Sequence, residues 1–236
     1  MKAAIVGYGK MGREIESVLV ERGHEVVAVI DEGGHIDLKT LAGAQVAIEF
    51  TTPETAFRNV RSCLEMRAAV VCGTTGWQDR LPQARDLCLR LGGTFFYSSN
   101  FSIGVNVFFA VNEKLAELMN GFPQYDISMR ETHHIHKKDA PSGTAVTLAE
   151  GIIGGVERKL SWVNHPTLEP EVLGIDSVRE GEVCGVHEVK YESDTDSIEI
   201  IHSSKNRRGL ALGAVLAAEY AIEHKGVLSM KDLLKM

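Results

Sequence analysis

The sequence has few cysteines, and none of them stands in a recognisable metal or redox motif. Its four cysteines form no Cys-x-x-Cys pair and no Cys/His grouping with the spacing of a zinc knuckle. Cys72 lies in an apolar run, where a thiol usually serves as a small core residue. Nothing in these positions indicates a zinc module or requires an oxidising compartment.

The chain also lacks long hydrophobic runs and an excess of positive charge. No apolar stretch approaches the ~20 residues that cross a bilayer, and the first residues turn glycine-rich too soon for a signal peptide. The formal net charge of -7 disfavours nonspecific binding to nucleic acid or to an anionic membrane surface. We therefore expect a cytoplasmic protein with neither nucleic acid nor a membrane as partner.

The composition is otherwise that of an ordinary globular protein. Of the 236 residues, 44% are hydrophobic and 24% are charged, and no internal repeat or low-complexity tract interrupts them. This length suits one large domain or two modest ones.

The first half alternates short apolar runs with helical patterns. The predicted strands cover residues 3–6, 26–30, 46–50, 69–72 and 94–97. The predicted helices cover residues 11–22 and 83–90, with another that begins at Thr52-Pro53. Strict alternation of strand and helix implies crossover connections and a parallel sheet. We therefore predict an α/β domain of the Rossmann type, with a doubly wound parallel sheet.

The pattern changes after Asn100. A long helix over 103–119 would carry Val107, Val111, Leu115 and Leu118 on one face. Residues 125–130 lead into a polar run, and the other predicted elements are a helix over 143–153, three strand-like segments at 173–178, 186–191 and 197–202, and an alanine-rich helix over 210–222.

These elements predict a smaller α+β domain with a mixed or antiparallel sheet. The last helix is predicted to return to the first domain. The expected division is a dinucleotide-binding domain of residues 1–101 and 207–236, and a substrate-binding domain of residues 102–206.

A glycine motif follows the first predicted strand. The run Gly7-Tyr8-Gly9-Lys10-Met11-Gly12 has the spacing G-x-G-x-x-G and opens the first helix. Gly7 would permit a tight turn, Gly9 would let the backbone approach a pyrophosphate, and Gly12 would let the helix pack on the sheet. Asp31 ends the second strand 19 residues after Gly12, where a carboxylate can bind the adenosine ribose. The motif therefore predicts a site for NADH or NADPH at the helix N-terminus.

Two further features concern the same cofactor. The loop Gly73-Thr74-Thr75-Gly76 follows the fourth strand, at the edge where such sheets hold ligands. Asp31 favours a free 2′-hydroxyl, the next residue is Glu32, and no cation follows closely. On charge alone NADH should bind at least as well as NADPH, unless Lys10 or Arg13 turns toward a phosphate.

Polar side chains crowd a short segment of the second half. They are His133, His134, His136, Lys137, Lys138 and Asp139. Such a cluster can be a solvated charged loop, a metal site, or a site for an anionic substrate. Two adjacent lysines would repel a cation, and no cysteine or well-placed glutamate completes a metal shell. We therefore predict no metal.

The residues that follow favour a substrate site. Ala140-Pro141-Ser142-Gly143-Thr144 precedes a helical pattern, so the backbone N–H groups of Gly143 and Thr144 would stand free at a helix start. A helix start of this kind binds carboxylates, while a histidine can donate a proton and a lysine can pair with negative charge. Together these groups predict a cradle for a dicarboxylate.

The run E-T-H-H-I-H-K-K-D-A-P-S-G-T, from Glu131 to Thr144, resembles the signature of the dihydrodipicolinate (4-hydroxy-tetrahydrodipicolinate) reductase family of lysine and diaminopimelate biosynthesis. The resemblance extends over C-G-T-T-G at 72–76, S-N-F-S-I-G-V-N at 99–106, R-E-G-E-V-C-G-V-H at 179–187 and the returning helix near 208–217. It covers nearly the whole chain.

The resemblance implies a role for each matching position. His133 would be the proton donor and acceptor, and Lys137 a second proton donor. His134, Gly143 and Thr144 would hold the substrate carboxylates. The cofactor contacts would be Gly7, Tyr8, Gly9, Lys10, Met11, Gly12, Asp31, Gly73, Thr74, Thr75, Ser98, Ser99, Asn100 and Phe101.

The implied reaction is hydride transfer from NADH or NADPH to a cyclic imine-type dicarboxylate, with protonation of the neighbouring ring carbon. The resemblance also implies a homotetramer that assembles through the second domain. The alternatives are another NAD(P)-dependent dehydrogenase of a small amino or hydroxy acid, a redox-sensing nucleotide-binding protein without catalysis, and a metal-dependent hydrolase. The sensor would have no use for His133 and Lys137, and the hydrolase none for the dinucleotide motif.

Overall fold

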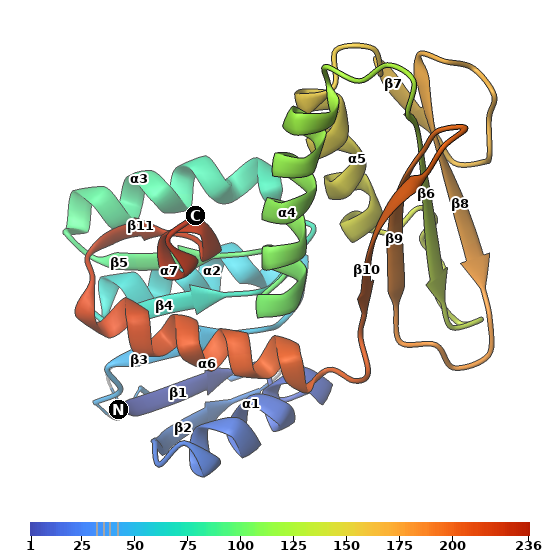
Figure 1. The fold of residues 1–236 in the computed structure, drawn as a ribbon. Helices are drawn as coiled ribbons and strands as arrows, with labels where there is room; N and C mark the ends of the chain where they lie inside the picture. Colours follow the sequence, from blue (N-terminus) through green and yellow to red (C-terminus); the bar gives the residue numbers. More distant parts are fainter. Residues whose placement is uncertain (32, 35, 38, 42) are drawn as a thin grey trace. The chain divides into compact units, whose positions relative to one another are not determined.

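The chain divides into two compact units (Figure 1). A computed structural model describes residues 1–31, 33–34, 36–37, 39–41 and 43–236. One unit consists of Met1–Asn106 and Arg207–Met236, and the other of Val107–Asn206. The sequence predicts the first boundary after residue 101. In the structure helix α4 (Ile103–Met119) carries the chain from the first unit into the second.

The first unit is built on a six-stranded parallel sheet with the order β11-β5-β4-β3-β1-β2. Its strands are β1 (Lys2–Val6), β2 (Glu25–Ile30), β3 (Val46–Glu49), β4 (Ala69–Cys72), β5 (Thr94–Tyr97) and β11 (Gly226–Leu228). Its helices besides the start of α4 are α1 (Lys10–Glu21), α2 (Pro53–Glu65), the short η1 (Gln78–Arg80), α3 (Leu81–Leu91), α6 (Arg208–Glu223) and α7 (Met230–Leu234).

Helices cover both faces of this sheet, as Figure 1 shows. Alternate residues of β1 enter different cores: Ile5 packs with α1 and α6, and Val6 packs with α2 and α3. Strands buried on both faces consist of nearly continuous apolar residues, which explains the short hydrophobic runs of the sequence. The predicted Rossmann-type fold is confirmed.

The strand order locates a ligand site in this unit. From β1 the chain first adds β2 on one side and then β3 on the other. Ligands of doubly wound sheets bind at the carboxyl ends of the strands where the order reverses. The turn after β1 and the ends of β2 and β3 therefore meet where a dinucleotide is expected.

The second unit holds a five-stranded mixed sheet with the order β10-β9-β6-β8-β7. Its strands are β6 (Asp126–His133), β7 (Ser161–Val163), β8 (Val172–Arg179), β9 (Val186–Glu192) and β10 (Ser197–Ser203). Strand β6 pairs in parallel with β8 and antiparallel with β9. Helix α5 (Gly143–Gly155) and most of α4 pack with this sheet around a third core, so the predicted α+β unit with a mixed sheet is confirmed.

The apolar face that the sequence indicates for α4 is mostly not its buried face. Of the four residues, Leu115 packs against the third core. Val107, Val111 and Leu118 are 44%, 45% and 59% exposed. The buried face instead carries Asn112, whose Nδ2 donates to the carbonyl of Leu148 in α5 at 3.0 Å, together with Phe108, Ala116 and Met119. Small and polar residues let α4 and α5 approach closely, and the hydrophobic pattern does not register such residues. No helix among the described residues is long and apolar enough to span a bilayer.

Candidate active site

The glycine turn after β1 is shaped for a close approach. Gly7 has φ +93°, and a Cβ there would lie 2.1 Å from the carbonyl oxygen of Phe50. A Cβ at Gly12 would lie 2.2 Å from the carbonyl oxygen of Gly7, so α1 packs directly on the turn. At Gly9, the residue before α1, no atom lies within 4 Å of a Cβ position. The helix N-terminus therefore opens onto free space, as a pyrophosphate requires.

A cavity of about 330 Å³ adjoins this turn. It is lined by Gly7, Tyr8, Gly9 and Asp31, among others. The carboxylate of Asp31 accepts a hydrogen bond from the amide of Tyr8 at 3.2 Å, which holds the acid beside the turn. Room for phosphates beside a fixed carboxylate fits a dinucleotide with its ribose on Asp31. Glu32, which bears on the cofactor prediction, lies outside the described residues.

The other predicted cofactor contacts come from α1 and from the loops after β4 and β5. Lys10 is exposed, and Met11 packs against the first core. After β4, Gly73 is half-buried and Thr75 exposed, while the carbonyl oxygen of Thr74 accepts from the Trp77 indole at 2.7 Å.

In the loop after β5, Ser99 is exposed and Ser98 Oγ donates to the Asn100 carbonyl at 2.6 Å. Phe101 is 1% exposed and packs on Phe50 and Phe96, with ring centroids 5.7 and 5.8 Å apart. The Phe101 ring therefore belongs to the core, and only its backbone is left for a cofactor.

A buried carboxylate, which the sequence analysis did not single out, ties the loop after β3 to the loop after β4. Glu49 at the end of β3 accepts hydrogen bonds from Thr74 Oγ1 at 2.8 Å, Cys72 Sγ at 3.0 Å and Asn59 Nδ2 at 3.3 Å, and also from the Thr51 hydroxyl. Burial, and then the charge of Glu49, raises the pKa of the Cys72 thiol well above its usual value, so this thiol remains a neutral donor. The sequence signal for this buried acid is a glutamate at the end of an otherwise apolar strand.

A cation that sequence reasoning also missed reaches the cofactor cavity. Arg58 of α2 lines that cavity together with Asp31. It also lines an adjoining cavity of about 600 Å³, which includes Arg61 and Arg80 and shares Gly33 and Gly34 with the first. Arg58 follows Asp31 by 27 residues and lies on another element, so its position in the sequence does not show that it adjoins this acid.

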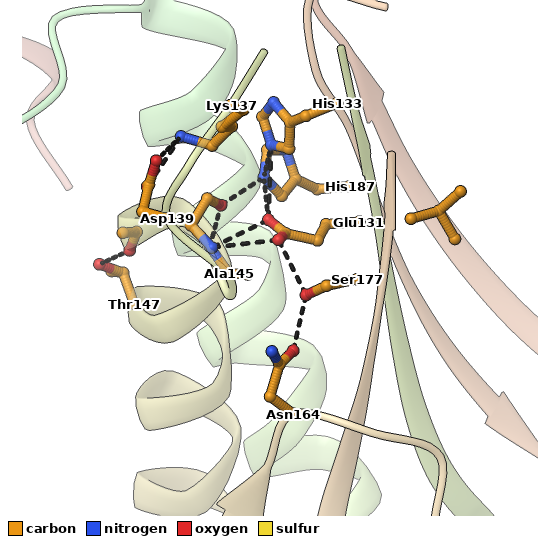
Figure 2. A network of polar contacts seen from close by, with 12 residues as sticks. Glu131, His133, Lys137, Asp139, Ala145, Thr147, Asn164, Ser177 and His187 are labelled. Carbon is orange, nitrogen blue, oxygen red and sulfur yellow. Dashed lines mark hydrogen bonds and ion pairs between the residues drawn. The ribbon is translucent and has the colours of Figure 1, made fainter. Parts of the chain in front are cut away.

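In the second unit, His133 lies in a buried polar cluster (Figure 2). His133 Nε2 lies 3.4 Å from Glu131 Oε2 and 3.4 Å from Nε2 of His187. Nε2 of His187 lies 3.7 Å from the same carboxylate oxygen. Glu131 is fully buried, and His187 and His133 are 5% and 8% exposed. Glu131 and His187 were missed as functional residues, although both lie in segments that carry the family resemblance.

Glu131 is the acceptor on which this cluster converges. Its two oxygens accept from the Ser142 amide, both at 3.1 Å, and Oε1 also accepts from Ser177 Oγ at 2.9 Å and Arg179 Nη2 at 3.3 Å. Burial alone would raise the pKa of Glu131, but hydrogen bonds from His133, His187, Ser142 and Ser177 hold it well below its usual range. Glu131 is therefore an anion throughout the working pH range.

The start of α5 is bonded to this cluster. Ser142, the N-cap of α5, accepts from the Ala145 amide at 3.2 Å through Oγ, and the same Oγ lies 3.1 Å from His187 Nε2. Gly143 and Thr144 are the first two residues of the helix, where backbone N–H groups have no acceptor within the helix. The structure thus brings the predicted carboxylate-binding amides beside the buried histidines.

Between His133 and α5 lie the other residues of the polar run. Nζ of Lys137 is 2.8 Å from both carboxylate oxygens of Asp139. Arg179 fastens this loop by donating to the carbonyls of Lys137 at 3.3 Å and Asp139 at 2.6 Å. Nδ1 of His134 is buried and has no hydrogen-bond partner in the described part of the chain. A buried, unpartnered ring nitrogen is suited to a ligand that supplies the missing partner.

The expectation that no glutamate completes a metal shell is wrong, because Glu131, His133 and His187 bring three potential ligand atoms within 4.8 Å of one another. Two observations weigh against an ion. The guanidinium of Arg179 lies beside Glu131, and Nδ1 of His187 is buried without a partner among the described residues. A metal-bound histidine normally donates its other N–H to an acceptor. The absence of a metal stays a prediction.

Comparisons with known proteins identify the family of this chain. Residues 1–101 match the family model described as dihydrodipicolinate reductase, N-terminus, and residues 104–234 match the corresponding C-terminus. A protein of Christiangramia forsetii named 4-hydroxy-tetrahydrodipicolinate reductase is 44% identical over 99% of this chain and 98% of its own. One of Neisseria meningitidis serogroup B with the same name is 33% identical over 99% and 97%.

A solved structure shares the fold. The dipicolinate-bound dihydrodipicolinate reductase from Paenisporosarcina sp. TG-14 has a TM-score of 0.78 at 24% identity and covers 97% of both chains. Both halves of the chain match one family, and relatives of that family align over nearly its full length. This chain belongs to the dihydrodipicolinate reductase family.

Proposed function

We propose that this protein reduces 4-hydroxy-tetrahydrodipicolinate (dihydrodipicolinate) to tetrahydrodipicolinate with NADH or NADPH, in lysine and diaminopimelate biosynthesis. The names of its relatives support this reaction. The observation that carries it is the bonding of Ser142 to both Glu131 and His187, because it sets a carboxylate-binding helix start beside a histidine that can move a proton. The dipicolinate bound to the Paenisporosarcina enzyme is a cyclic dicarboxylate of the expected kind.

In this proposal the first unit holds the dinucleotide. The turn from Gly7 to Gly12 faces its pyrophosphate, Asp31 its adenosine ribose, and the loops at Gly73–Thr75 and Ser98–Phe101 its nicotinamide half. The cofactor supplies the hydride that reduces the substrate ring.

The second unit holds the dicarboxylate. His134 and the amides of Gly143 and Thr144 bind the carboxylates. The ammonium of Lys137 neutralises negative charge and serves as a second proton donor, while His133 protonates the ring carbon next to the one that receives hydride. No role requires a metal.

The test is a coupled assay that begins from the product of dihydrodipicolinate synthase. Oxidation of NADH or NADPH is followed by absorbance, with and without a chelator. We expect substrate-dependent oxidation that the chelator leaves unchanged. No oxidation with either cofactor would refute the proposed activity, and loss of activity with the chelator would refute the metal-free mechanism.

Arg58 is proposed as a determinant of NADPH affinity. Arg58 lines the same cavity as Asp31, and a 2′-phosphate is normally held by an arginine. For Arg58→Ala we expect NADPH affinity to fall about tenfold, equivalent to ~1.4 kcal/mol, with NADH affinity nearly unchanged. Isothermal titration with each cofactor measures both constants. Arg90→Ala, an exposed arginine of α3 outside both cavities, is the control; equal losses for NADH and NADPH would contradict this role.

A homotetramer assembled through the second unit is also proposed. Strand β10 lies at an edge of its sheet with Ile198 and Ile201 38% and 57% exposed, and an apolar edge strand favours association. We expect Ile201→Lys to shift sedimentation toward smaller species, whereas Asp86→Lys, at an exposed position of α3 in the first unit, leaves it unchanged. A wild-type protein that sediments as a monomer would contradict the proposal.

Cytoplasmic location is likewise proposed, and cell fractionation tests it.

A further inference from the structure

The two ring nitrogens of His133 have different surroundings. Nε2 faces the buried cluster, 3.4 Å from Glu131 Oε2. Nδ1 forms no hydrogen bond within the described part of the chain and is not among its fully buried unpartnered atoms, so it is the nitrogen that reaches the surface. Resting on the proposed function, we propose that His133 delivers the reacting proton from Nδ1, while Glu131 is a positioning residue that holds Nε2–H.

The chemistry of Glu131 decides which nitrogen keeps its proton. Hydrogen bonds keep the pKa of Glu131 low despite its burial, so its carboxylate only accepts. An imidazole nitrogen that faces an acceptor-only group must carry a hydrogen. Nε2 of His133 lies 3.4 Å from Oε2 of Glu131, so we assign a hydrogen to this nitrogen. Nε2 of His187 lies 3.7 Å from the same oxygen but only 3.1 Å from Ser142 Oγ, its nearest partner.

The role of His187 follows from the same arrangement. If the neutral ring carries its hydrogen on Nε2, the buried Nδ1 has only a lone pair and needs no acceptor. The other tautomer would place an N–H group at Nδ1, where the described residues offer no acceptor. Strand register also fixes the cluster, because Glu131 lies opposite His187 of β9 and opposite Ser177 of β8. Arg179, opposite His133 on β8, supplies positive charge 3.3 Å from Oε1 of Glu131. His187 and Arg179 thus hold the carboxylate of Glu131 in place, and this carboxylate in turn holds the ring of His133.

The outer edge of His133 is kept free of side chains. A Cβ at Gly185 would lie 2.9 Å from Cε1 and 3.2 Å from Nδ1 of His133. Glycine at position 185 therefore keeps a side chain away from Nδ1. Nε2 lies against Glu131 and His187 in the buried cluster, so Nδ1 is the nitrogen left for the substrate.

The proton step then balances without movement of the ring. Reduction of the substrate leaves an electron pair on the neighbouring ring carbon, and this pair forms the new C–H bond. The Nδ1–H bond of the His133 imidazolium breaks, and its electrons stay on Nδ1. The ring becomes neutral with Nε2–H still donated to Glu131, so it is already in place when solvent returns a proton to Nδ1.

The decisive test uses the wild-type protein with ¹⁵N-labelled histidine. Nuclear magnetic resonance distinguishes the two neutral tautomers, and His133→Gln identifies the signals of residue 133. We expect the neutral ring to carry hydrogen on Nε2. A neutral ring with hydrogen on Nδ1 and a bare Nε2 would overturn the proposal. This measurement does not depend on turnover. It therefore tests the tautomer of His133 separately from the proposed activity.

Variants of Glu131 give a second test. Glu131→Gln places an amide donor or a neutral acceptor beside Nε2, and we expect kcat to fall about 10²-fold or more. KM should change little, and both tautomers of His133 should appear. Glu131→Asp keeps the charge and should recover part of kcat, while the exposed Glu182→Gln serves as control. Wild-type kcat in Glu131→Gln, or equal losses for Gln and Asp, would overturn the role; if either variant fails to fold, the wild-type spectrum decides.

Discussion

Replacing His133 with glutamine is expected to lower kcat by about 10²- to 10⁴-fold, the usual contribution of a general acid. Glutamine has a similar reach and can still hydrogen-bond, but it cannot release a proton at neutral pH. The side chain belongs to the second unit, whereas the dinucleotide motif belongs to the first. Affinity for NADH and NADPH should therefore stay at the wild-type value. Steady-state kinetics and isothermal titration on the same preparation measure the two quantities.

The matched control is His136→Gln in the same polar run. His136 is 70% exposed and lies 3.3 Å from the similarly exposed Glu182, so its loss should leave kcat close to wild type. Cofactor affinity that falls in step with kcat in His133→Gln would point to a structural defect and remove the proton role of His133.

Lys137→Met is expected to give the second large effect, a loss of about 10²- to 10³-fold in kcat/KM. The methionine keeps the apolar stem but removes the ammonium that pairs with Asp139 and, in the proposed function, with the substrate. The loop should keep its shape, because Arg179 holds it through backbone carbonyls. Kinetics over a range of substrate concentrations separate the loss in kcat from the rise in KM.

Lys138→Met provides the comparison, since Lys138 is exposed and has the same chemistry one position later. If both lysine variants lose activity equally, the effect is one of general positive charge. The specific role of Lys137 would then be lost.

Much of the fold could be predicted because its signals are local. The G-x-G-x-x-G turn, the apolar strands and the proline at the start of α2 each depend on a few neighbouring residues. Strands β7 and β11, with three residues each, are too short for a periodic pattern to register. The buried face of α4 differs from the apolar face that its sequence indicates, because Asn112 and Ala116 make the close contact with α5 and neither residue adds to a hydrophobic stripe.

The candidate site could be predicted only where it is contiguous in sequence. His133, His134, Lys137 and the start of α5 lie within one run, so their spacing was informative. Glu131 and His187 meet only through the register of β6 and β9, which a single sequence does not reveal. Arg58 and Asp31 line one cavity because the strand order brings their elements together. Their separation in the sequence does not reveal this neighbourhood.

The return of the chain to the first unit has a consequence for biosynthesis. Helix α6 contributes Ala214, Val215 and Ala218 to the core that contains Ile5 and Ile48, yet these residues are translated after the whole of the second unit. One face of the nucleotide-binding sheet therefore stays uncovered while the second unit emerges from the ribosome. The inserted unit can complete its own core first, and the first unit closes only after α6 has been made. A message truncated within the α6 codons would release a chain with an exposed apolar sheet, a natural substrate for chaperones and proteases.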